Sequence, residues 1–357
     1  MPDTKPTIKR ILIVRTDRLG DVVLTLPMLP ELRKRYPDAH IAMLLRTYTG
    51  EIVIDNPYLD ELIWYDEKHQ LITFGTMVAT LRERKFDAVI VVYPTIRLAW
   101  LVFRARIPVR IGTGYRYYSM LFNKRVYEHR KDAKKHEVEY NLRLLEELGC
   151  HVSGPLEFRI QISDRQKKEL REITETANID LGRPYVIVHP GSGGSARDWS
   201  TRKFGQLAAR LHGENNLQVI VTGTDSENDK VNEVVREAHG NAISLAGKMN
   251  LRQFAALIRD AALFVSNSTG PIHVAAAMGT PVIGLYPQHT PMSERRWGPY
   301  TSKKRVFVPE RPLECNDCIE QDLPQCNCMD TIEVEDVFVA ATQLMTSSVL
   351  ERKGESS

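Results

Sequence analysis

The chain has 357 residues, of which 43% are hydrophobic and 26% are charged, a composition that fits an ordinary soluble globular protein long enough for two domains. Lys and Arg number 48 and Asp and Glu 45, so the net charge of +3 does not by itself indicate an anionic partner. No stretch is long enough and apolar enough to span a membrane, and no signal-peptide pattern opens the chain. We therefore expect a cytoplasmic protein whose five cysteines do not form structural disulfides.

The first half alternates strand and helix patterns. Short apolar runs bounded by turn residues predict strands over 11–14, 41–45, 61–64, 88–92 and 156–162. Periodic stretches predict helices over 22–35, 71–84, 137–148 and 165–176, and an amphipathic helix directly after the strand at 88–92. Such alternation predicts a parallel sheet with helices on both faces.

A second alternating unit follows Leu181–Pro184, the best candidate for a domain boundary. We expect strands over 185–189, 218–222, 263–266 and 282–285, a short strand at 243, and helices over 201–212, 226–238, 251–260 and 270–278. A last helix is expected near 334–350, followed by a frayed tail. The predicted fold class is therefore α/β, with two doubly wound domains.

The stretch Arg15–Val23 joins the first predicted strand to the first predicted helix. Gly20 permits a tight turn at this point. Asp21 then falls near the start of the helix, at the carboxyl end of the strand, where open α/β sheets place their ligands. A helix cap is the alternative role for a lone Asp at such a position.

The stretch Ser268–His273 follows a predicted buried strand and opens a predicted helix. Backbone N–H groups and the helix dipole attract phosphate at such a point, and two hydroxyl side chains add donors. The alternative is an ordinary helix start with Pro271 in its first turn.

A glycine-containing loop, His189–Gly194, follows the first strand of the second unit. Its glycines let the backbone approach a ligand closely, and Ser192 offers a hydroxyl group. Arg197 lies a few residues further on and could pair with a diphosphate. The alternative is a flexible surface loop with a solvated Arg197.

These three stretches together resemble the lipopolysaccharide heptosyltransferases, glycosyltransferase family nine, and the resemblance runs from about residue 10 to about residue 340. It implies a GT-B architecture, with two Rossmann-like domains that face each other across a cleft. It also implies an acceptor-binding domain over 1–180, a nucleotide-sugar-binding domain over 181–333, and a terminal segment over 334–357 whose helix crosses back to the first domain.

The activity that the resemblance implies is an inverting transfer of heptose from ADP-heptose to the inner core of lipopolysaccharide. The acceptor would be a lipid-anchored phosphorylated glycan. No cofactor would be required, because protein cations and a helix N-terminus can stabilise the leaving diphosphate.

The resemblance also assigns roles to individual residues. Asp21 would accept the proton of the acceptor hydroxyl, and Arg197 would stabilise the departing diphosphate. Glu227 would bind the donor ribose, and Met249 would pack on the adenine. The remaining donor-binding candidates are Gly191, Ser192, Gly193, Ser268, Thr269, Gly270 and His273. The candidates for binding acceptor phosphates or carboxylates are Arg18, Arg110, Arg116 and Lys124.

Ser268 departs from the family pattern, in which many members have Asp. That Asp is expected to touch the donor sugar, so another nucleotide sugar stays open as the donor. A protein or another glycan also stays open as the acceptor, as does a non-catalytic nucleotide-sugar-binding protein, against which the intact Asp21 argues.

Basic residues concentrate between Arg97 and Lys135, where eleven Lys and Arg stand against two acidic residues. Such a distribution suits an anionic partner. We expect peripheral binding to the anionic inner face of the cytoplasmic membrane, because the implied acceptor is lipid-anchored and this chain shows no hydrophobic anchor. No nucleic-acid-binding module is recognisable, so we expect no nucleic acid partner.

The cysteine tract contains Cys315, Cys318, Cys326 and Cys328. Four thiolates within fourteen residues could hold a structural zinc ion, although the C-x-C half is unusual for such a site. Free thiols in a loop are the alternative. Cys150 stands apart and is expected in the core.

Overall fold

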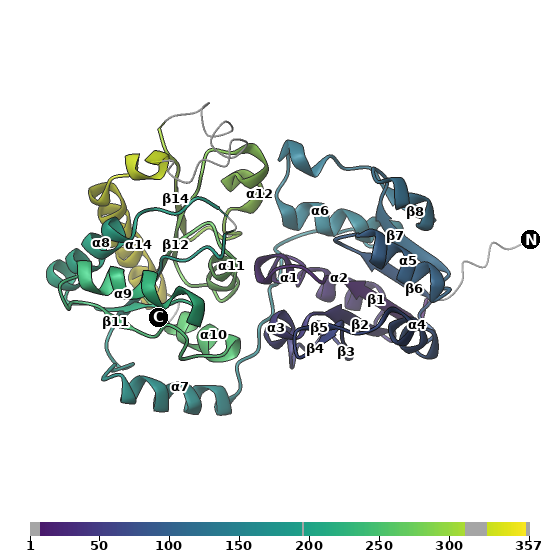
Figure 1. Cartoon of the computed structure of the whole chain (residues 1–357), viewed down its shortest axis with the longest axis horizontal. Helices are drawn as coiled ribbons and strands as arrows, with labels where there is room; N and C mark the ends of the chain where they lie inside the picture. The colour runs from purple at the N-terminus through teal and green to yellow at the C-terminus, as the bar shows by residue number, and fades with distance from the viewer. Residues whose placement is uncertain (1–7, 195, 311–326, 355–357) are drawn as a thin grey trace, which may run out of the picture. The chain divides into compact units, whose positions relative to one another are not determined.

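The computed structural model describes residues 8–194, 196–310 and 327–354. The chain divides into two compact units. One comprises Met1–Arg130 and Lys135–Gln161, and the other Lys131–Lys134 and Ile162–Ser357. Each unit is an α/β domain built on its own six-stranded parallel sheet (Figure 1).

The sheet of the first unit has the strand order β3-β2-β1-β6-β7-β8. Its strands are β1 (Arg10–Val14), β2 (His40–Leu45), β3 (Glu61–Trp64), β6 (Ala88–Val91), β7 (Val109–Thr113) and β8 (Lys124–Val126). Neighbouring strands are all parallel. The central strands are continuous apolar runs because both of their faces are covered, and the residues of Ile11–Val14 are completely buried.

Helices α4 (Phe74–Glu83) and α5 (Ile96–Arg104) cover one face of this sheet, where their apolar sides form a core cluster with Leu12 and Val14 of β1. Burying a side chain such as Leu12 contributes about 2 kcal/mol. The other elements of the unit are α1 (Leu19–Val23), α2 (Met28–Arg35), α3 (Thr47–Gly50), η1 (Glu51–Val53), β4 (Asp66–Glu67), β5 (Gln70–Leu71), η2 (Tyr117–Leu121), α6 (Glu137–Arg143) and η4 (Leu144–Leu148), while η3 (Arg130–Asp132) begins at the last residue before Lys131–Lys134.

The sheet of the second unit has the order β11-β10-β9-β12-β13-β14. Its strands are β9 (Tyr185–His189), β10 (Gln218–Val221), β11 (Ile243–Ser244), β12 (Leu263–Asn267), β13 (Val282–Leu285) and β14 (Lys304–Phe307), all parallel. Its helices are α7 (Asp164–Thr176), α8 (Thr201–Asn215), α9 (Asn228–Glu237), α10 (Leu251–Asp260), α11 (Gly270–Ala277), α12 (Glu294–Trp297) and α14 (Val334–Gly354), with η5 (Asp225–Glu227), η6 (Thr290–Met292) and η7 (Asn327–Thr331).

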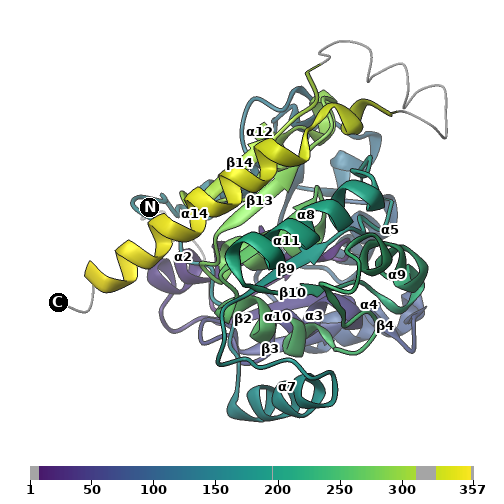
Figure 2. The same ribbon diagram turned by 90° about the vertical axis from the view of Figure 1, so that its left-hand side faces the viewer.

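The core of the second unit joins α8, α9 and α14 to one face of the sheet. Val186 and Val188 of β9 pack there against Phe204 of α8, Val234 of α9 and Ala341 of α14. Figure 2 shows α14 beside α8, and the contacts of α14 include α8, β12 and β14. The predicted return of this terminal helix to the first domain stays a prediction.

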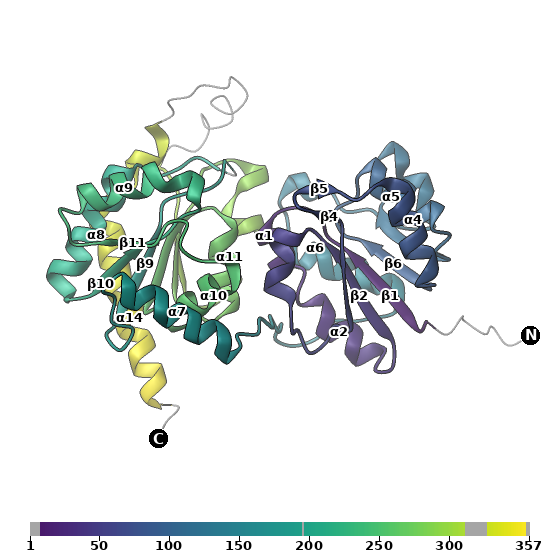
Figure 3. The ribbon, with the colours of Figure 1, turned by 60° about the horizontal axis from the view of Figure 1, so that its bottom comes forward.

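Helix α7 belongs to the second unit, although the sequence pattern predicts the domain boundary after this helix. It packs on α10 (Figure 3), where Nε2 of Gln253 donates a hydrogen bond to Glu169 at 3.0 Å. Its buried Leu170 supplies the apolar contact. The division near Gln161 therefore lies about one helix earlier than the predicted boundary at Leu181–Pro184.

Two predicted elements were wrong, and one strand was not predicted. The helix expected over 22–35 is two helices, because the chain turns between Val23 and Met28 and Pro27 cannot donate to a continuing helix. The strand expected over 156–162 is irregular chain, held by side chains such as Asn56, whose Nδ2 donates to the carbonyl of Arg159 at 2.8 Å. The sequence pattern did not predict β8, a short strand with two exposed basic residues.

The amphipathic helix expected after the fourth strand is confirmed as α5. Cys150 is buried, as expected, and burial raises its pKa to about 11. Within the described residues, no helix combines the length and the apolar character needed to cross a bilayer.

Candidate active site

Each sheet has a point at which its strand order reverses. In the first unit this point lies between β1 and β6, whose last residues Val14 and Val91 are paired in register. In the second unit it lies between β9 and β12, where His189 pairs with Ser266. Open α/β sheets bind ligands at the carboxyl ends of the strands beside such a point. The predicted site residues Asp21 and His189–Gly194 follow these strand ends directly.

Asp21 lies in the first turn of α1, directly after β1 and a short loop. Its side chain is 15% exposed, so the carboxylate is largely enclosed but still reachable from solvent. The hydroxyl group of Thr25 donates to the carbonyl of Asp21 at 2.8 Å and fixes the local backbone. Arg18 precedes the helix as an exposed side chain.

A buried guanidinium holds the carboxylate of Asp21. Arg15, whose side chain is 1% exposed, donates from Nη2 to Oδ1 of Asp21 and from Nε to Oδ1 of Asp17 at 2.8 Å. Its Nη1 lies 3.7 Å from Oε1 of Glu137 and 3.4 Å from Oδ1 of Asn141. A buried cation is tolerated only when it is paired and hydrogen-bonded, and three carboxylates meet that need here.

A second arginine extends this cluster. Arg130 pairs with Glu137, and its Nη1 donates to Oδ1 of Asn141 at 3.1 Å. Nδ2 of Asn141 in turn donates to the carbonyl of Leu24 at 3.0 Å. The cluster therefore ties α6 to the segment that carries Asp21.

Burial raises the pKa of Asp17 to about 7. The positive charge of Arg15 opposes this shift, and the negative charge of Asp21 reinforces it. At neutral pH, which is close to this pKa, Asp17 is protonated in only part of the molecules. Asp21, which lies in the first turn of α1 at the carboxyl edge of the sheet, stays the candidate base.

The four candidate acceptor-binding cations do not gather around Asp21. Arg18 stands closest along the chain. Arg116 is exposed after β7, at the same edge of the sheet. Nζ of Lys124 lies 3.7 Å from Oε2 of Glu147.

Arg110 lies in the sheet itself and not at its carboxyl edge. It is level with Leu12, the middle residue of β1, because Arg110 pairs with Val89 and Val89 pairs with Leu12. Its guanidinium donates to the carbonyls of Leu121 at 2.8 Å and Ile107 at 2.6 Å. These bonds tie η2 to the segment that precedes β7, and the acceptor-binding role of Arg110 stays a prediction.

In the second unit, Asn267 at the end of β12 anchors the loop that follows β9. Its Nδ2 donates to the carbonyl of Pro190 at 2.8 Å, and its Oδ1 accepts from the N–H of Trp199 at 2.9 Å. The ring of Trp199 is buried, and its Nε1 donates to the carbonyl of Ile332 at 3.0 Å. Both ends of the loop are therefore fixed at the switch point by one completely buried amide.

The loop between these anchors contains two residues with left-handed backbone, Gly193 (φ +56°) and Gly194 (φ +71°). Glycine is the residue that adopts this conformation without steric cost. Gly191 lies against Glu227, and a side chain in its place would overlap the carboxylate. The backbone can therefore come close to the acid that is predicted to bind ribose.

Glu227 is oriented by the turn that begins α9. Its Oε2 accepts hydrogen bonds from the N–H of Thr224 at 2.9 Å and from the Thr224 hydroxyl at 2.8 Å. Burial disfavours its charged form, but these bonds, together with His189 and the N–H of Gly193, outweigh burial and lower its pKa. Glu227 is therefore a carboxylate at neutral pH, able to accept from hydroxyl groups.

His189 is a neutral structural residue. Burial lowers its pKa to about 4, and its Nδ1 shares a hydrogen bond of 2.9 Å with the hydroxyl of Thr222. Its ring lies 5.7 Å from that of Phe254 between centroids. It lies at the end of β9, where the loop begins, and its ring carries no charge at neutral pH.

The predicted phosphate-binding segment begins α11, as expected. Thr269 is the residue before the helix and has extended backbone, and its side chain makes no capping bond. Pro271 lies in the first turn, and His273 is buried. The backbone at Ser268 is held by a hydrogen bond from its N–H to the carbonyl of Leu285 at 3.0 Å.

The two remaining donor candidates are partly exposed. Met249 lies in the loop between β11 and α10, directly before the capping residue Asn250. Arg197 is half-buried in the loop anchored by Asn267. The structure thus brings the donor candidates to the carboxyl edge of one sheet, and their individual roles stay predictions.

Three members of the cysteine tract, Cys315, Cys318 and Cys326, lie outside the described residues. Cys328 lies in η7 and is half-buried. In the described part of the chain, no cluster of three or more His, Cys, Asp or Glu side chains could hold a metal ion. The zinc prediction is therefore untested.

The family model of glycosyltransferase family 9 (heptosyltransferase) matches residues 75–325. The chain belongs to glycosyltransferase family 9. Lipopolysaccharide heptosyltransferase 3 of Escherichia coli strain K12 is 31% identical to it over 278 residues, which are 75% of this chain and 79% of the relative. This family 9 chain is a glycosyltransferase, as predicted.

Two solved structures show the same fold. One is the glycosyl transferase family 9 protein from Veillonella parvula, with a TM-score of 0.82, 24% identity, and coverage of 95% of this chain and 97% of that one. The other is ADP-heptose lipopolysaccharide heptosyltransferase II of E. coli, with a TM-score of 0.77, 23% identity, and coverage of 95% and 99%. The predicted GT-B fold class, with two Rossmann-like domains, is thereby confirmed.

Several site residues of this family 9 enzyme were not predicted. Arg15 and Asp17 stand in the stretch that drew attention to Asp21, but no local pattern shows that Arg15 is buried. The sequence around Glu137 and Asn267 indicates a role in the site even less clearly. A polar residue at the end of an apolar strand, as Asn267 is, was the one available hint.

Proposed function

We propose that this glycosyltransferase transfers heptose from ADP-heptose to the inner core of lipopolysaccharide, with inversion at the anomeric carbon. The names of its relatives support the donor and the acceptor class. The observation that carries the proposal is the Asp21 carboxylate, partly exposed at a switch point and held by the buried Arg15.

The proposed reaction is a single displacement. The acceptor hydroxyl attacks the anomeric carbon while its proton passes to a carboxylate oxygen of Asp21. The bond between that carbon and the diphosphate oxygen breaks, and ADP leaves with the bonding electrons. The guanidinium of Arg15 would hold the Asp21 carboxylate in position for this transfer.

The second unit would bind the donor. Glu227 would accept hydrogen bonds from the ribose, and the backbone of the loop anchored by Asn267 would approach the diphosphate. The N-terminus of α11 and Arg197 would stabilise the charge that grows on the departing diphosphate. Met249 would contact the adenine.

A donor screen tests the proposal. The protein is incubated with truncated lipopolysaccharide and, in separate reactions, with ADP-heptose, GDP-sugars and UDP-sugars, and release of the nucleoside diphosphate is measured. Release of ADP that depends on the acceptor is expected. Turnover with GDP- or UDP-sugars in place of ADP-heptose would contradict the donor assignment.

Ser268 is the specific reason to include other sugars in that screen. The hydroxyl group of Ser268 cannot accept hydrogen bonds as strongly as the Asp of many relatives. An ADP-linked sugar other than heptose is the second candidate donor. Release of ADP that is faster from such a sugar than from ADP-heptose would identify that sugar as the donor.

We further propose that the chemistry uses no metal ion, and that the enzyme binds peripherally to the cytoplasmic membrane. For the cysteine tract we propose a structural zinc ion. Elemental analysis of protein purified under reducing conditions separates this proposal from free thiols, because a bound zinc would give close to one metal per chain.

A further inference from the structure

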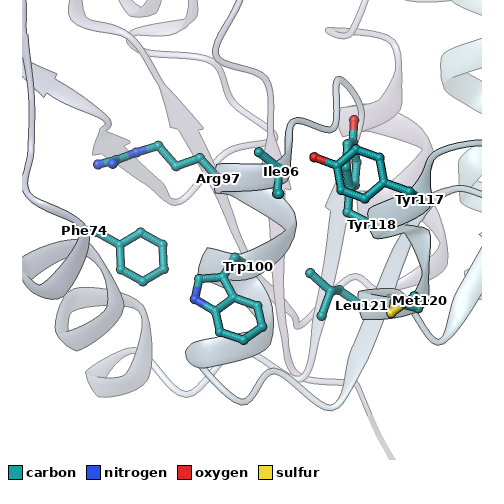
Figure 4. A pocket seen from close by; sticks show the side chains of 8 residues that line it. All are labelled: Phe74, Ile96, Arg97, Trp100, Tyr117, Tyr118, Met120 and Leu121. Carbon is teal, nitrogen blue, oxygen red and sulfur yellow. The ribbon is translucent and has the colours of Figure 1, made fainter.

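An apolar groove lies in the first unit between α4, α5 and η2. It has a volume of about 610 Å³. Figure 4 shows the side chains that line it: Phe74, Ile96, Arg97, Trp100, Tyr117, Tyr118, Met120 and Leu121. None of these residues belongs to the candidate active site.

Helix α5 has two apolar faces. One, which includes Leu98 and Leu101, is buried in the core. The other consists of Ile96, Trp100 and Phe103, which follow one another at helical spacing and are 52%, 43% and 42% exposed. The opposite face of α5 already packs in the core. An exposed apolar stripe on such a helix indicates a surface that binds a partner.

The far wall of the groove continues this apolar surface. Tyr117 and Met120 of η2 are each 74% exposed, more than any residue of the α5 stripe. Trp and Tyr rings have an apolar body and a polar tip, which places them at membrane interfaces. Met adapts its shape to irregular apolar ligands.

The one charged residue of the lining, Arg97, has its guanidinium fixed by hydrogen bonds at the edge of the groove, where the guanidinium carbon lies 5.7 Å from the centroid of the Phe74 ring. Nε of Arg97 donates to the hydroxyl of Tyr65 at 2.8 Å, and its Nη2 donates to the carbonyl of Ile72 at 2.9 Å. Figure 4 shows the guanidinium pointing away from Trp100. The stem of Arg97 therefore adds hydrocarbon to the wall, and the lining suits a hydrocarbon chain better than a sugar or a nucleotide.

The chain segment that carries α5 and η2 is basic. The segment Ile96–Tyr127 contains seven Lys and Arg and no Asp or Glu. Arg104 and Arg106 are exposed, and no ion pair holds them in the described part of the chain. By contrast, Nζ of Lys135 lies 2.8 Å from Glu128, and Nζ of Lys134 lies 3.7 Å from Asp132. Arg104, one helical turn after the lining residue Trp100 on α5, is thus a positive charge without a partner in an ion pair among the described residues.

We propose that this groove receives an acyl chain of an anionic bilayer lipid. Trp100 and Tyr117 lie at the level of the headgroups, and Arg104 and Arg106 bind lipid phosphates. The apolar lining would bind the acyl chain, and the basic segment that carries α5 and η2 would bind the anionic surface. The proposal deepens the membrane association proposed above, but it does not depend on which sugar is transferred.

Vesicle sedimentation of the full chain tests this site. Vesicles of phosphatidylcholine alone are compared with vesicles that also contain phosphatidylglycerol, at low and high salt. The wild type should bind only the anionic vesicles, and binding should weaken as salt is raised. The double variant Trp100→Ser/Met120→Ser should lower partitioning about tenfold, because both side chains are exposed in the free protein and buried only on binding.

Two control variants separate the groove from general effects. Val339→Ser removes an exposed apolar side chain from α14 and should leave partitioning unchanged. Arg104→Glu/Arg106→Glu should weaken binding more than Lys134→Glu, whose lysine is already paired. Phosphatidylglycerol with a photoreactive acyl chain should label peptides that contain Trp100 or Met120.

The proposal is overturned if the serine double variant binds as the wild type does, or if the label falls outside the groove. It is equally overturned if light scattering shows that the groove variants convert a dimer to a monomer, since a second copy would then be the occupant. Loss of vesicle binding with unchanged turnover of a short soluble acceptor supports it. A wild type that binds vesicles but does not use ADP-heptose would contradict the proposed donor and leave this site intact.

Discussion

Arg15 donates a hydrogen bond from its buried guanidinium to the carboxylate of Asp21, six residues further along the chain. The two residues flank the turn between β1 and α1, so the bond sets the direction of the carboxylate at the carboxyl edge of the sheet. The same guanidinium contacts Asp17 and Glu137. The proposed base is therefore positioned by a buried charge cluster and not by its helix alone.

The first prediction concerns the shape of Arg15. Arg15→Lys keeps a positive charge but cannot bridge Asp17 and Asp21 with a planar fork. We expect kcat to fall about tenfold or more with little change in the affinity for ADP, because a mispositioned base slows only the chemical step. Steady-state kinetics and calorimetry measure the two quantities.

Arg15→Ala is expected to be more severe, because it leaves Asp17, Asp21 and Glu137 without their shared cation. Breaking a buried ion pair in this way costs about 3–5 kcal/mol of folding stability. Urea unfolding measures the loss. Wild-type kcat in the Lys variant and wild-type stability in the Ala variant would together show that Arg15 does not position the Asp21 carboxylate.

The second prediction concerns pH. The pKa of Asp17 is raised in the folded protein, so the folded state holds a proton that the unfolded state releases. The stability that comes from this group is present below its unfolded pKa and is lost as pH rises toward about 7. Asp17→Asn removes this titration.

The free energy of unfolding of Asp17→Asn, measured relative to the wild type, should therefore rise between about pH 5 and about pH 7, by on the order of 1 kcal/mol per pH unit. Urea unfolding of both proteins across this range supplies the comparison. A difference between them that stays constant with pH would show that Asp17 has an ordinary pKa.

The third prediction concerns the loop anchor. Asn267→Ala removes the hydrogen bonds to Pro190 and Trp199, so the loop between them should lose its fixed position. We expect the affinity for ADP to fall about tenfold, since each bond lost beside a buried partner costs about 1–3 kcal/mol. Calorimetry with ADP measures this effect.

Gln343→Ala, at an exposed position on α14, is the matched control for that experiment. It should bind ADP as the wild type does. If the Asn267 variant keeps its stability and also binds ADP normally, the loop does not form the donor site.

The fourth prediction concerns Arg197. Arg197→Ala should weaken both the binding of the ADP-sugar and its turnover, because it removes a cation proposed to face the diphosphate. Arg202→Ala is the control, since Arg202 is an exposed arginine on the neighbouring helix α8. Equal behaviour of the two variants would place Arg197 among the surface charges that do not touch the donor.

Sequence patterns predicted most of the fold because apolar runs and glycine-rich turns are local signals. The runs at Ile11–Val14 and Tyr185–His189 are continuous, as expected of strands that are buried on both faces. The break before Met28 was missed, because the apolar period continues through it. β8 was missed because its short polar edge sequence resembles a loop.

The positions of the site residues followed from the same local signals, but their partners did not. Asp21 and Ser268–His273 could be identified because each follows a strand and opens a helix. Arg15 meets Glu137 across more than a hundred residues of sequence, and only the tertiary fold brings them together. The sequence likewise shows no sign that the guanidinium of Arg110 donates hydrogen bonds to the carbonyls of Leu121 and Ile107.

The central claim is that Asp21 is the base that deprotonates the acceptor. Asp21→Asn keeps the size of the side chain and removes its capacity to take up the proton. Its kcat for acceptor-dependent ADP release from ADP-heptose should fall by about two to four orders of magnitude, with the affinity for ADP unchanged. An Asn variant that turns over at a rate close to that of the wild type would contradict the claim.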